Sequence, residues 1–255
     1  MKIVISPAKS LDFSQSFNTK NFSQNLFEKE SQLLINKLKQ LSKKQLGDLM
    51  KLSPKLTDLN HERYEEWKLP FTIENAKPAG AVFTGEVYKG LDLLSLSEKN
   101  LQKAQNSLRI LSGLYGILKP LDLIQPYRLE MGTRLDYNSK IKNLYQFWDS
   151  KITNQLNKEL SEDDGILVNL ASNEYFKAVK PKDLKGEVIT CNFKENKNGA
   201  YKIIMMYAKN ARGKMSRYII ENDLKKKEEL MTFDLDGYVF NPRLSSDNDF
   251  IFTRN

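Results

Sequence analysis

The sequence predicts a mixed fold of helices and strands, α/β or α+β in class, built as a single domain. Two short apolar runs rich in β-branched residues, 2–6 and 165–170, are typical of buried strands. Residues 145–160 carry apolar side chains at every fourth position, which is typical of an amphipathic helix. The turn-rich segment 195–199 separates two strand-like runs and indicates an antiparallel hairpin.

The N-terminal half begins with a strand and continues mainly as helices. Pro7 ends the first strand, and the loop after it carries Lys9. Ser53 is a favourable N-cap, and Pro54 suits the first position of the helix that follows. His61 lies off the stripe of this helix, so we expect it to be an exposed polar residue. The stripe itself, at helical spacing, consists of Leu56, Leu59, Arg63, Tyr64 and Trp67. We predict a strand at 2–6, helices at 28–41, 43–50, 54–67 and 97–106, a short strand at 81–83, and a strand or continued helix at 108–111.

The C-terminal half contains the clearest helix of the chain and several strands. Ser172 follows the strand at 165–170 and marks a helix start, so this part reads as a strand–turn–helix unit. The hairpin around 195–199 is followed by another helix. We predict helices at 145–160, 175–179 and 208–221, and strands at 165–170, 187–193, 201–207, 237–240 and 249–253.

Cys191 and His61 are the only cysteine and histidine of the chain, and this limits its chemistry. One cysteine cannot form an internal disulfide, and zinc sites need three or four His or Cys ligands. A metal site would have to consist of carboxylates, and we predict neither a metal nor another cofactor. Cys191 is a weak candidate for a redox sensor, because a thiol in a predicted strand is more often buried and inert.

The sequence shows no segment that resembles a targeting signal or a membrane span. The first residues lead into 6–9 without the apolar stretch of a signal peptide, and no apolar run approaches ~18 residues. We therefore expect a cytoplasmic protein without a membrane partner, and we favour a monomer.

Positive charge is concentrated in one region. The chain has 40 Lys and Arg against 32 Asp and Glu, and residues 172–226 contain 13 of the former and 6 of the latter. Residues 201–220 contain no acidic residue at all. Such a stretch is either a solvated surface or a patch that faces a polyanion.

The helix predicted at 208–221 contains the densest part of this charge. At 100° per residue, Gly213 falls on the face expected to be exposed, where bare backbone would let phosphates approach. The alternative for Gly213 is a kink or a packing contact. The buried face is expected to hold Ala208, Ala211, Met215, Tyr218 and Ile219, and the exposed face Lys209, Gly213, Ser216 and Arg217, with Arg212 at the border.

Two segments are candidates for the hairpin of a helix-hairpin-helix element, whose amides hold a DNA phosphate. In residues 108–120, Gly113 and Gly116 follow a leucine pair, although two residues rather than one separate the glycines. The second candidate is the helix pair at 43–67, with Ser53 at its turn and Lys51 and Lys55 beside it. An ordinary corner between two helices is the alternative for each.

Polar residues also gather at predicted strand ends, where α/β sheets commonly place ligand groups. Lys9 follows the first strand, and Asn169, Ser172, Asn173 and Glu174 lie at the end of the strand at 165–170. Arg128 and Glu130 share one face of an extended segment and form either a salt bridge or an anion-binding arginine beside an acid/base carboxylate. No Walker loop, G-x-G-x-x-G motif or Ser-His-Asp set can be assembled.

Several motifs, in order along nearly the full chain, resemble those of a known family. They are SPAK at 6–9, LSGLYG at 111–116, PLDLIQPYRLEMG at 120–132, YQFW at 145–148, NLAS at 169–172 with EYFK at 174–177, and AK, ARG and MSR within 208–217. The family is that of the bacterial YaaA peroxide stress response proteins. The chain departs from it at Asp149, where glycine is common, and in a short C-terminal tail without extra basic residues.

This resemblance implies a compact α/β domain of unusual topology, with a helix-hairpin-helix element and a positively charged cleft that binds duplex DNA. It also implies a cytoplasmic role in limiting oxidative damage under hydrogen peroxide, associated with lowered unincorporated iron. Because one Cys and one His cannot form a conventional ferrous site, we expect any effect on iron to be indirect.

Three functions remain open. The first is a DNA-binding protein that recognises shape and charge. The second is an enzyme acting on a nucleobase or nucleotide, with Glu130 or Glu174 as acid/base and Asn169, Ser172 and Lys9 as contacts. A third is an interaction protein with an acidic partner. The expected DNA contacts are Lys9, Arg128, Lys177, Lys180, Lys209, Arg212, Lys214 and Arg217, with the amides of Gly113 or Gly116.

Overall fold

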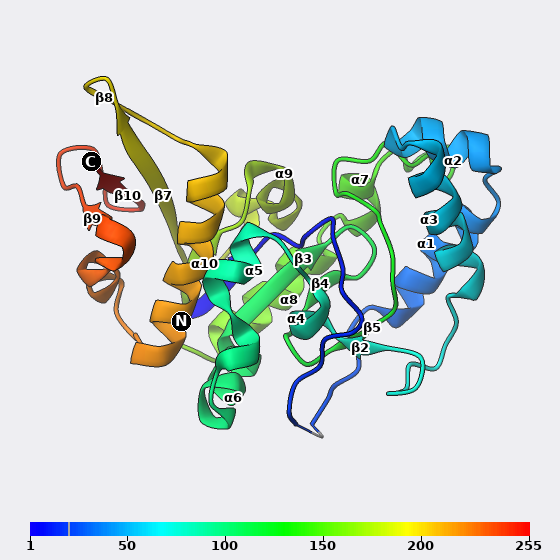
Figure 1. Cartoon of the computed structure of the whole chain (residues 1–255), viewed down its shortest axis with the longest axis horizontal. Helices are drawn as coiled ribbons and strands as arrows, with labels where there is room; N and C mark the ends of the chain where they lie inside the picture. The colour runs from blue at the N-terminus through cyan, green and yellow to red at the C-terminus, as the bar shows by residue number, and fades with distance from the viewer. Residues whose placement is uncertain (20) are drawn as a thin grey trace.

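A mixed sheet of eight strands forms the centre of the computed structural model, which describes residues 1–19 and 21–255 (Figure 1). The strand order is β4-β3-β1-β6-β7-β10-β9, and β8 pairs with β7. These strands are β1 (Lys2–Ile5), β3 (Leu108–Ser112), β4 (Gly116–Leu118), β6 (Ile166–Leu170), β7 (Glu187–Lys197), β8 (Ala200–Lys202), β9 (Val239–Phe240) and β10 (Asp249–Arg254). A separate pair joins β2 (Lys77–Pro78) to β5 (Leu123–Ile124).

The five central strands are parallel, and their order reverses beside β1. The chain passes from β1 to β3 on one side and later returns to β6 on the other side of β1. The loops that follow β1 and β6 therefore lead away in opposite directions. In open α/β sheets, such a switch point leaves a crevice at the carboxyl ends of the strands.

Helices surround the sheet, and α1–α3 lie at the opposite end of the long axis from the β7–β8 hairpin (Figure 1). The α-helices are α1 (Glu28–Lys39), α2 (Lys43–Met50), α3 (Pro54–Glu66), α4 (Ala79–Val82), α5 (Glu86–Leu91), α6 (Glu98–Ser107), α7 (Leu144–Trp148), α8 (Lys151–Ser161), α9 (Asn173–Phe176) and α10 (Met205–Asn222). Short 3-10 helices are η1 (Leu93–Ser95), η2 (Lys177–Val179), η3 (Pro181–Asp183), η4 (Lys227–Thr232) and η5 (Leu235–Gly237).

The predicted mixed α/β class is confirmed, and the helix starts follow the expected capping chemistry. The hydroxyl of Ser53 accepts the Leu56 amide at the start of α3, and that of Ser97 accepts the Asn100 amide at the start of α6. Residues 108–111, left open between strand and helix, belong to strand β3. One apolar cluster extends from β1 through β3, β6 and β10.

Three predicted elements are wrong. The helix expected at 145–160 is broken into α7 and α8 at Asp149, whose backbone has φ 44° and ψ −115°. This is a conformation that glycine adopts readily and other residues seldom do. Residues 81–83 fall mostly in the helical turn α4, and the strand expected at 201–207 ends at Lys202 because α10 begins at Met205.

The prediction of an exposed face on α10 holds for Lys209 but is wrong for Gly213 and Ser216. Gly213 and Ser216 are buried, because α10 packs against both the sheet and α5. A Cβ at Gly213 would lie 1.9 Å from the carbonyl oxygen of Val87, and one at Gly90 would lie 2.1 Å from that of Asn210. Gly213 is thus a packing contact and not a bare backbone surface. His61, expected to be exposed, is half-buried.

Residues 108–120 form a β-hairpin in the core and not a helix-hairpin-helix. Both glycines are buried: Gly113 lies in the link between β3 and β4, and Gly116 is the first residue of β4. The indole Nε1 of Trp148 donates to the Gly113 carbonyl at 2.9 Å, and a Cβ at Gly116 would lie 2.7 Å from the Trp148 ring. Phosphates of a duplex cannot reach these amides, so the expected contact at Gly113 or Gly116 is also wrong.

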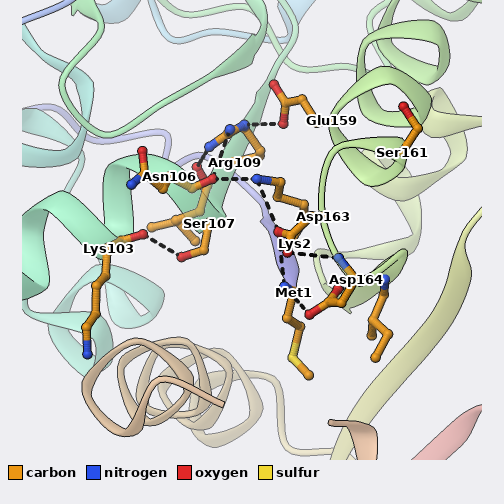
Figure 2. A network of polar contacts seen from close by, with 12 residues as sticks. Met1, Lys2, Lys103, Asn106, Ser107, Arg109, Glu159, Ser161, Asp163 and Asp164 are labelled. Carbon is orange, nitrogen blue, oxygen red and sulfur yellow. Dashed lines mark hydrogen bonds and ion pairs between the residues drawn. The ribbon is translucent and has the colours of Figure 1, made fainter. Parts of the chain in front are cut away.

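The amino end of β1 is tied down by a polar network (Figure 2). The N-terminal ammonium of Met1 lies 3.1 Å from an oxygen of Asp163 and also contacts Asp164. Beside it, Arg109 forms an ion pair of 2.7 Å with Glu159 while both side chains are almost fully buried. This network fixes the amino end of β1, and the switch-point crevice lies at the other, carboxyl end of the strands.

Candidate functional site

A cleft of about 420 Å³ opens at the carboxyl ends of β1 and β6, where the strand order reverses. Residues 6–10 after β1 and Ser172, Glu174 and Tyr175 after β6 line it, as does Glu130. Residues 84–88 and three side chains of α10 close the other side. Of the polar residues predicted at these two strand ends, Lys9, Ser172 and Glu174 line the cleft, whereas Asn169 and Asn173 do not.

Ser6 and Ser172 join the two diverging loops at the floor of the cleft. The Ser172 amide donates to the hydroxyl oxygen of Ser6 at 2.9 Å, and the two hydroxyl oxygens lie 3.2 Å apart. The phenol of Tyr88 donates to the carbonyl oxygen of Ser6 at 3.1 Å. These bonds fix the spacing of the two strand ends, so the cleft is held by rigid elements.

Carboxylates occupy one wall of the cleft. Glu130 accepts Lys9 Nζ at 2.7 Å with one oxygen and Arg128 Nη2 at 3.1 Å with the other. Of the two possibilities for Arg128 and Glu130, the salt bridge is the one observed. Glu174 Oε1 accepts the amide of Gly132 at 2.9 Å, which holds its carboxylate beside this pair.

The opposite wall, on α10, holds cations that have no acidic partner in the part of the chain that the structure describes. Lys209 and Arg212 are one helical turn apart and both line the cleft. Within residues 1–19 and 21–255, no acceptor lies within hydrogen-bond distance of the buried Nε of Arg212. Burial lowers the pKa of the Arg212 guanidinium. A desolvated cation without a counter-charge is costly, so this wall is suited to an anion.

The remaining predicted cations lie outside the cleft and mostly have partners. Lys180 pairs with Asp149, and Lys214 pairs with Asp236. Lys177 lies 5.0 Å from the centre of the Tyr145 ring. Arg217 binds the Asp92 carbonyl at 2.8 Å, the Ser95 hydroxyl at 2.9 Å and the Glu221 carboxylate at 2.8 Å, so it fastens α10 to the end of α5.

Arg63 on α3 is a candidate that the sequence reasoning missed. The phenol of the next residue, Tyr64, donates to the carbonyl oxygen of Arg128, which brings α3 to the cleft wall. Burial lowers the pKa of Arg63, and the nearby Arg128 lowers it further against an opposing effect of Tyr64. An available signal was the position of Arg63 on the stripe expected to be buried, where a charge is unusual.

Two further expected residues serve the structure around the cleft. Asn169 is buried and accepts the Ala171 amide at 3.1 Å. Cys191 is buried in β7, and burial raises the pKa of its thiol. In the part of the chain that the structure describes, no group of three or more His, Cys, Asp or Glu side chains is placed to hold a metal ion. No helix there is long and apolar enough to cross a membrane.

Comparison with known proteins finds similarity over the whole chain. A family model described as peroxide stress protein YaaA matches residues 1–244. UPF0246 proteins of Colwellia psychrerythraea and Aliivibrio fischeri are each 54% identical over 255 residues, covering 100% of this chain and 99% and 98% of the relatives. A UPF0246 protein of Saccharophagus degradans is 52% identical over 255 residues, covering 100% of this chain and 99% of its own. Every residue that lines the cleft falls within the matched range.

Proposed function

The chain belongs to the peroxide stress protein YaaA family, and from this premise we propose that it acts in the cytoplasmic response to peroxide as a DNA-binding protein. The switch-point cleft is its central contact, and bound duplex or distorted DNA is shielded from oxidative, iron-linked damage. The protein works without a cofactor of its own and as a monomer.

The observation that carries this proposal is Arg212. Its Nε is buried and has no acceptor among the described residues, and Lys209 stands one turn away. A phosphate would supply the missing counter-charge, because the planar guanidinium fork matches phosphate oxygens and its charge persists at all physiological pH values. DNA is the polyanion that places phosphates at regular spacing along such a surface.

A second contact is the helix pair α2–α3, the remaining candidate for the helix-hairpin-helix. Lys51 joins the two helices with φ 53°, and Ser53 caps α3. Lys51 and Lys55 are exposed beside this turn. Tyr64, which bonds Arg128, lies in the last turn of α3, so a strand that leaves the cleft past Arg63 and Arg128 would have to run along the length of α3 to reach this turn. Of the expected contacts, Lys177, Lys180, Lys214 and Arg217 lie off this path and contribute little.

A salt titration of duplex binding tests the proposal. Binding of wild-type protein should weaken by orders of magnitude between about 50 and 200 mM salt. A Lys209→Gln, Arg212→Gln variant should bind at least about tenfold more weakly, with a salt slope smaller by about two. Lys225→Gln is the matched control, since Lys225 lies near Asp163 and Asp164 at the opposite sheet edge. Salt-independent binding, or an unchanged slope in the double variant, would contradict the proposal.

An enzyme acting on a nucleobase or nucleotide is the second candidate, favoured by one observation. Glu130 and Glu174 line the same cavity as the cationic wall, within reach of one bound group. Either carboxylate would act as the acid/base. Base release and strand cleavage should be assayed on normal, damaged and bulged DNA with wild type and Glu130→Gln. Activity that the variant loses would support the enzyme, and inactivity of the wild type on all three would refute it.

A further inference from the structure

The two walls of the cleft differ in charge, which a surface built only for a phosphate backbone does not need. The wall on α10 has the cations Lys209 and Arg212, whereas the facing wall has the carboxylates Glu130 and Glu174, with Lys9 and Arg128 paired to Glu130. A phosphate placed beside Glu174, which forms no ion pair with any described residue, would be repelled. We propose that the cleft binds a single nucleotide unit, with its phosphate on the α10 wall and its hydroxyl or amino groups on the carboxylate wall. This inference deepens the proposed function and rests on its assignment of the ligand as nucleic acid.

The phosphate end is set by Arg212 and Lys209. Both side chains belong to one face of α10, a helix of 18 residues with no acidic residue in its first turn. Glu86, which also lines the cavity, is paired with Lys89 at 2.8 Å. Among the described residues, no carboxylate forms an ion pair with Lys209 or Arg212, so both cations are available to a phosphate.

The donor-binding end is set by Glu174. Both oxygens of Glu130 are already engaged by Lys9 and Arg128. Glu174 uses Oε1 to accept the Gly132 amide, whereas its Oε2 makes no hydrogen bond to any described residue. Carboxylate oxygens accept sugar hydroxyls and exocyclic amines but repel phosphate. Glu174 thereby fixes which end of a nucleotide faces this wall.

The size and lining of the cleft fit one nucleotide. A volume of about 420 Å³ falls in the range of small-molecule sites and is far too small to enclose a duplex. Tyr88 and Tyr175 give the cavity an apolar surface, and Met205 adds to it from α10 itself. A sugar or base can rest there while the charged groups hold its ends. The unit is either a free mononucleotide or a nucleotide turned out of a DNA strand.

Calorimetric titration tests the arrangement with three kinds of probe: each 2′-deoxynucleoside 5′-monophosphate, the matching nucleosides, and inorganic phosphate. At least one monophosphate should bind tenfold or more tightly than its nucleoside and than inorganic phosphate. Arg212→Gln should reduce monophosphate binding to the level of the nucleoside. Glu174→Gln should weaken the monophosphate several-fold but leave inorganic phosphate unchanged. Lys225→Gln should bind as wild type, and thermal unfolding of each variant confirms that it is folded.

Oligonucleotides separate the two sources of the nucleotide. If it comes from DNA, a duplex with one unpaired nucleotide should bind more tightly than the fully paired duplex, and the preferred monophosphate or Glu174→Gln should abolish only this advantage. If it is free, the monophosphate should bind while the two duplexes bind equally. No preference for any monophosphate together with no effect of the unpaired nucleotide would overturn the inference. If wild-type protein binds no duplex at all, the proposed function is overturned. Binding of a monophosphate would in that case still support the nucleotide site.

Discussion

Gly213 of α10 lies so close to Val87 of α5 that an added Cβ would come within 1.9 Å of the Val87 carbonyl oxygen. The contact matters for the cleft because α5 begins in the segment that forms one side and α10 supplies the cationic wall. Two helices that cross at glycine approach more closely than larger residues allow. The distance between these helices therefore sets the position of Arg212 over the cleft.

Gly213→Ala should destabilise the protein by about 1–3 kcal/mol, because the methyl group must push α5 and α10 apart. Helix propensity alone gives the opposite sign, a gain of about 1 kcal/mol for alanine over glycine inside a helix. Urea unfolding measures the difference. Gly90→Ala tests the same crossing from α5, where a Cβ would lie 2.1 Å from the Asn210 carbonyl oxygen. Increased stability in either variant would contradict the close crossing.

The buried ion pair of Arg109 and Glu159 should behave as a coupled unit. Glu159→Ala leaves a guanidinium that is 3% exposed without its carboxylate, and should cost about 3–5 kcal/mol. Arg109 also donates to the Leu108 carbonyl at 2.7 Å, so it contributes beyond the pair. Arg109→Met combined with Glu159→Leu should cost clearly less than the sum of Arg109→Met and Glu159→Leu. A double-mutant cycle from chemical unfolding measures the coupling, and additive costs would show that none exists.

Asp163 should make stability depend on pH in acid. Burial raises the pKa of Asp163, but the Asp164 amide, the N-terminal ammonium and Lys2 outweigh this effect and lower the pKa to about 2. Since the pKa is below the unfolded value of 3.8, the stabilisation is complete above about pH 5 and is lost as pH falls towards 2. Its size should be about 1 kcal/mol, because the partly exposed pair is screened.

Urea unfolding at several pH values between 6 and 3 checks this dependence. Asp163→Asn should be less stable than wild type at pH 6, and the difference should shrink towards pH 3. The exposed Asp234→Asn is the control and should follow wild type at every pH. A constant difference between wild type and Asp163→Asn would contradict the assigned role of the N-terminal pair.

Cys191 should be inert to thiol reagents and to peroxide in the folded protein. It is 1% exposed, and burial raises the pKa of its thiol, so little thiolate forms and none is accessible. Ellman's reagent should react with one thiol only after unfolding in denaturant. Rapid reaction of the native protein would restore Cys191 as a sensor. If the native protein does not react, the cleft rather than Cys191 is the part of the molecule to test under peroxide stress.

The sequence sufficed for most elements, because periodicity and capping residues act locally. The break at Asp149 was missed since the apolar spacing continues through it, and only the backbone conformation there separates α7 from α8. Gly213 was misplaced for a different reason. A helical wheel assumes one buried face, whereas α10 is covered by the sheet and by α5.

The position of the candidate site could be predicted from the sequence, but which of its charged side chains form ion pairs could not. Lys9 and Glu174 could be placed at strand ends because parallel strands end at one edge. Which cations are free could not be foreseen, because the partner of Lys214 is Asp236 and that of Arg217 includes Asp92, both distant in sequence. Ion pairing of this kind depends on the tertiary fold. Arg212 became distinct only when its surroundings were known.

Arg212 and Arg217, five residues apart on α10, should therefore respond in opposite ways to the same substitution. Arg217→Gln removes bonds to the Asp92 carbonyl and the Ser95 hydroxyl and should destabilise the protein by about 1–3 kcal/mol. Arg212→Gln removes a half-buried cation whose buried Nε has no acceptor among the described residues, so stability should be unchanged or rise by about 1 kcal/mol. A residue kept at a cost to stability is expected where it serves binding.

Thermal or urea unfolding and duplex binding, measured on both variants, test this contrast. Arg212→Gln should keep or gain stability and lose at least about tenfold in affinity, as expected for a phosphate contact in a desolvated site. Arg217→Gln should lose stability and, while folded, keep most of its affinity, because its guanidinium is occupied by α5 and Glu221. If Arg212→Gln were instead the destabilising change, its guanidinium would be a structural group. That result would contradict the proposal that the cationic wall is a binding site.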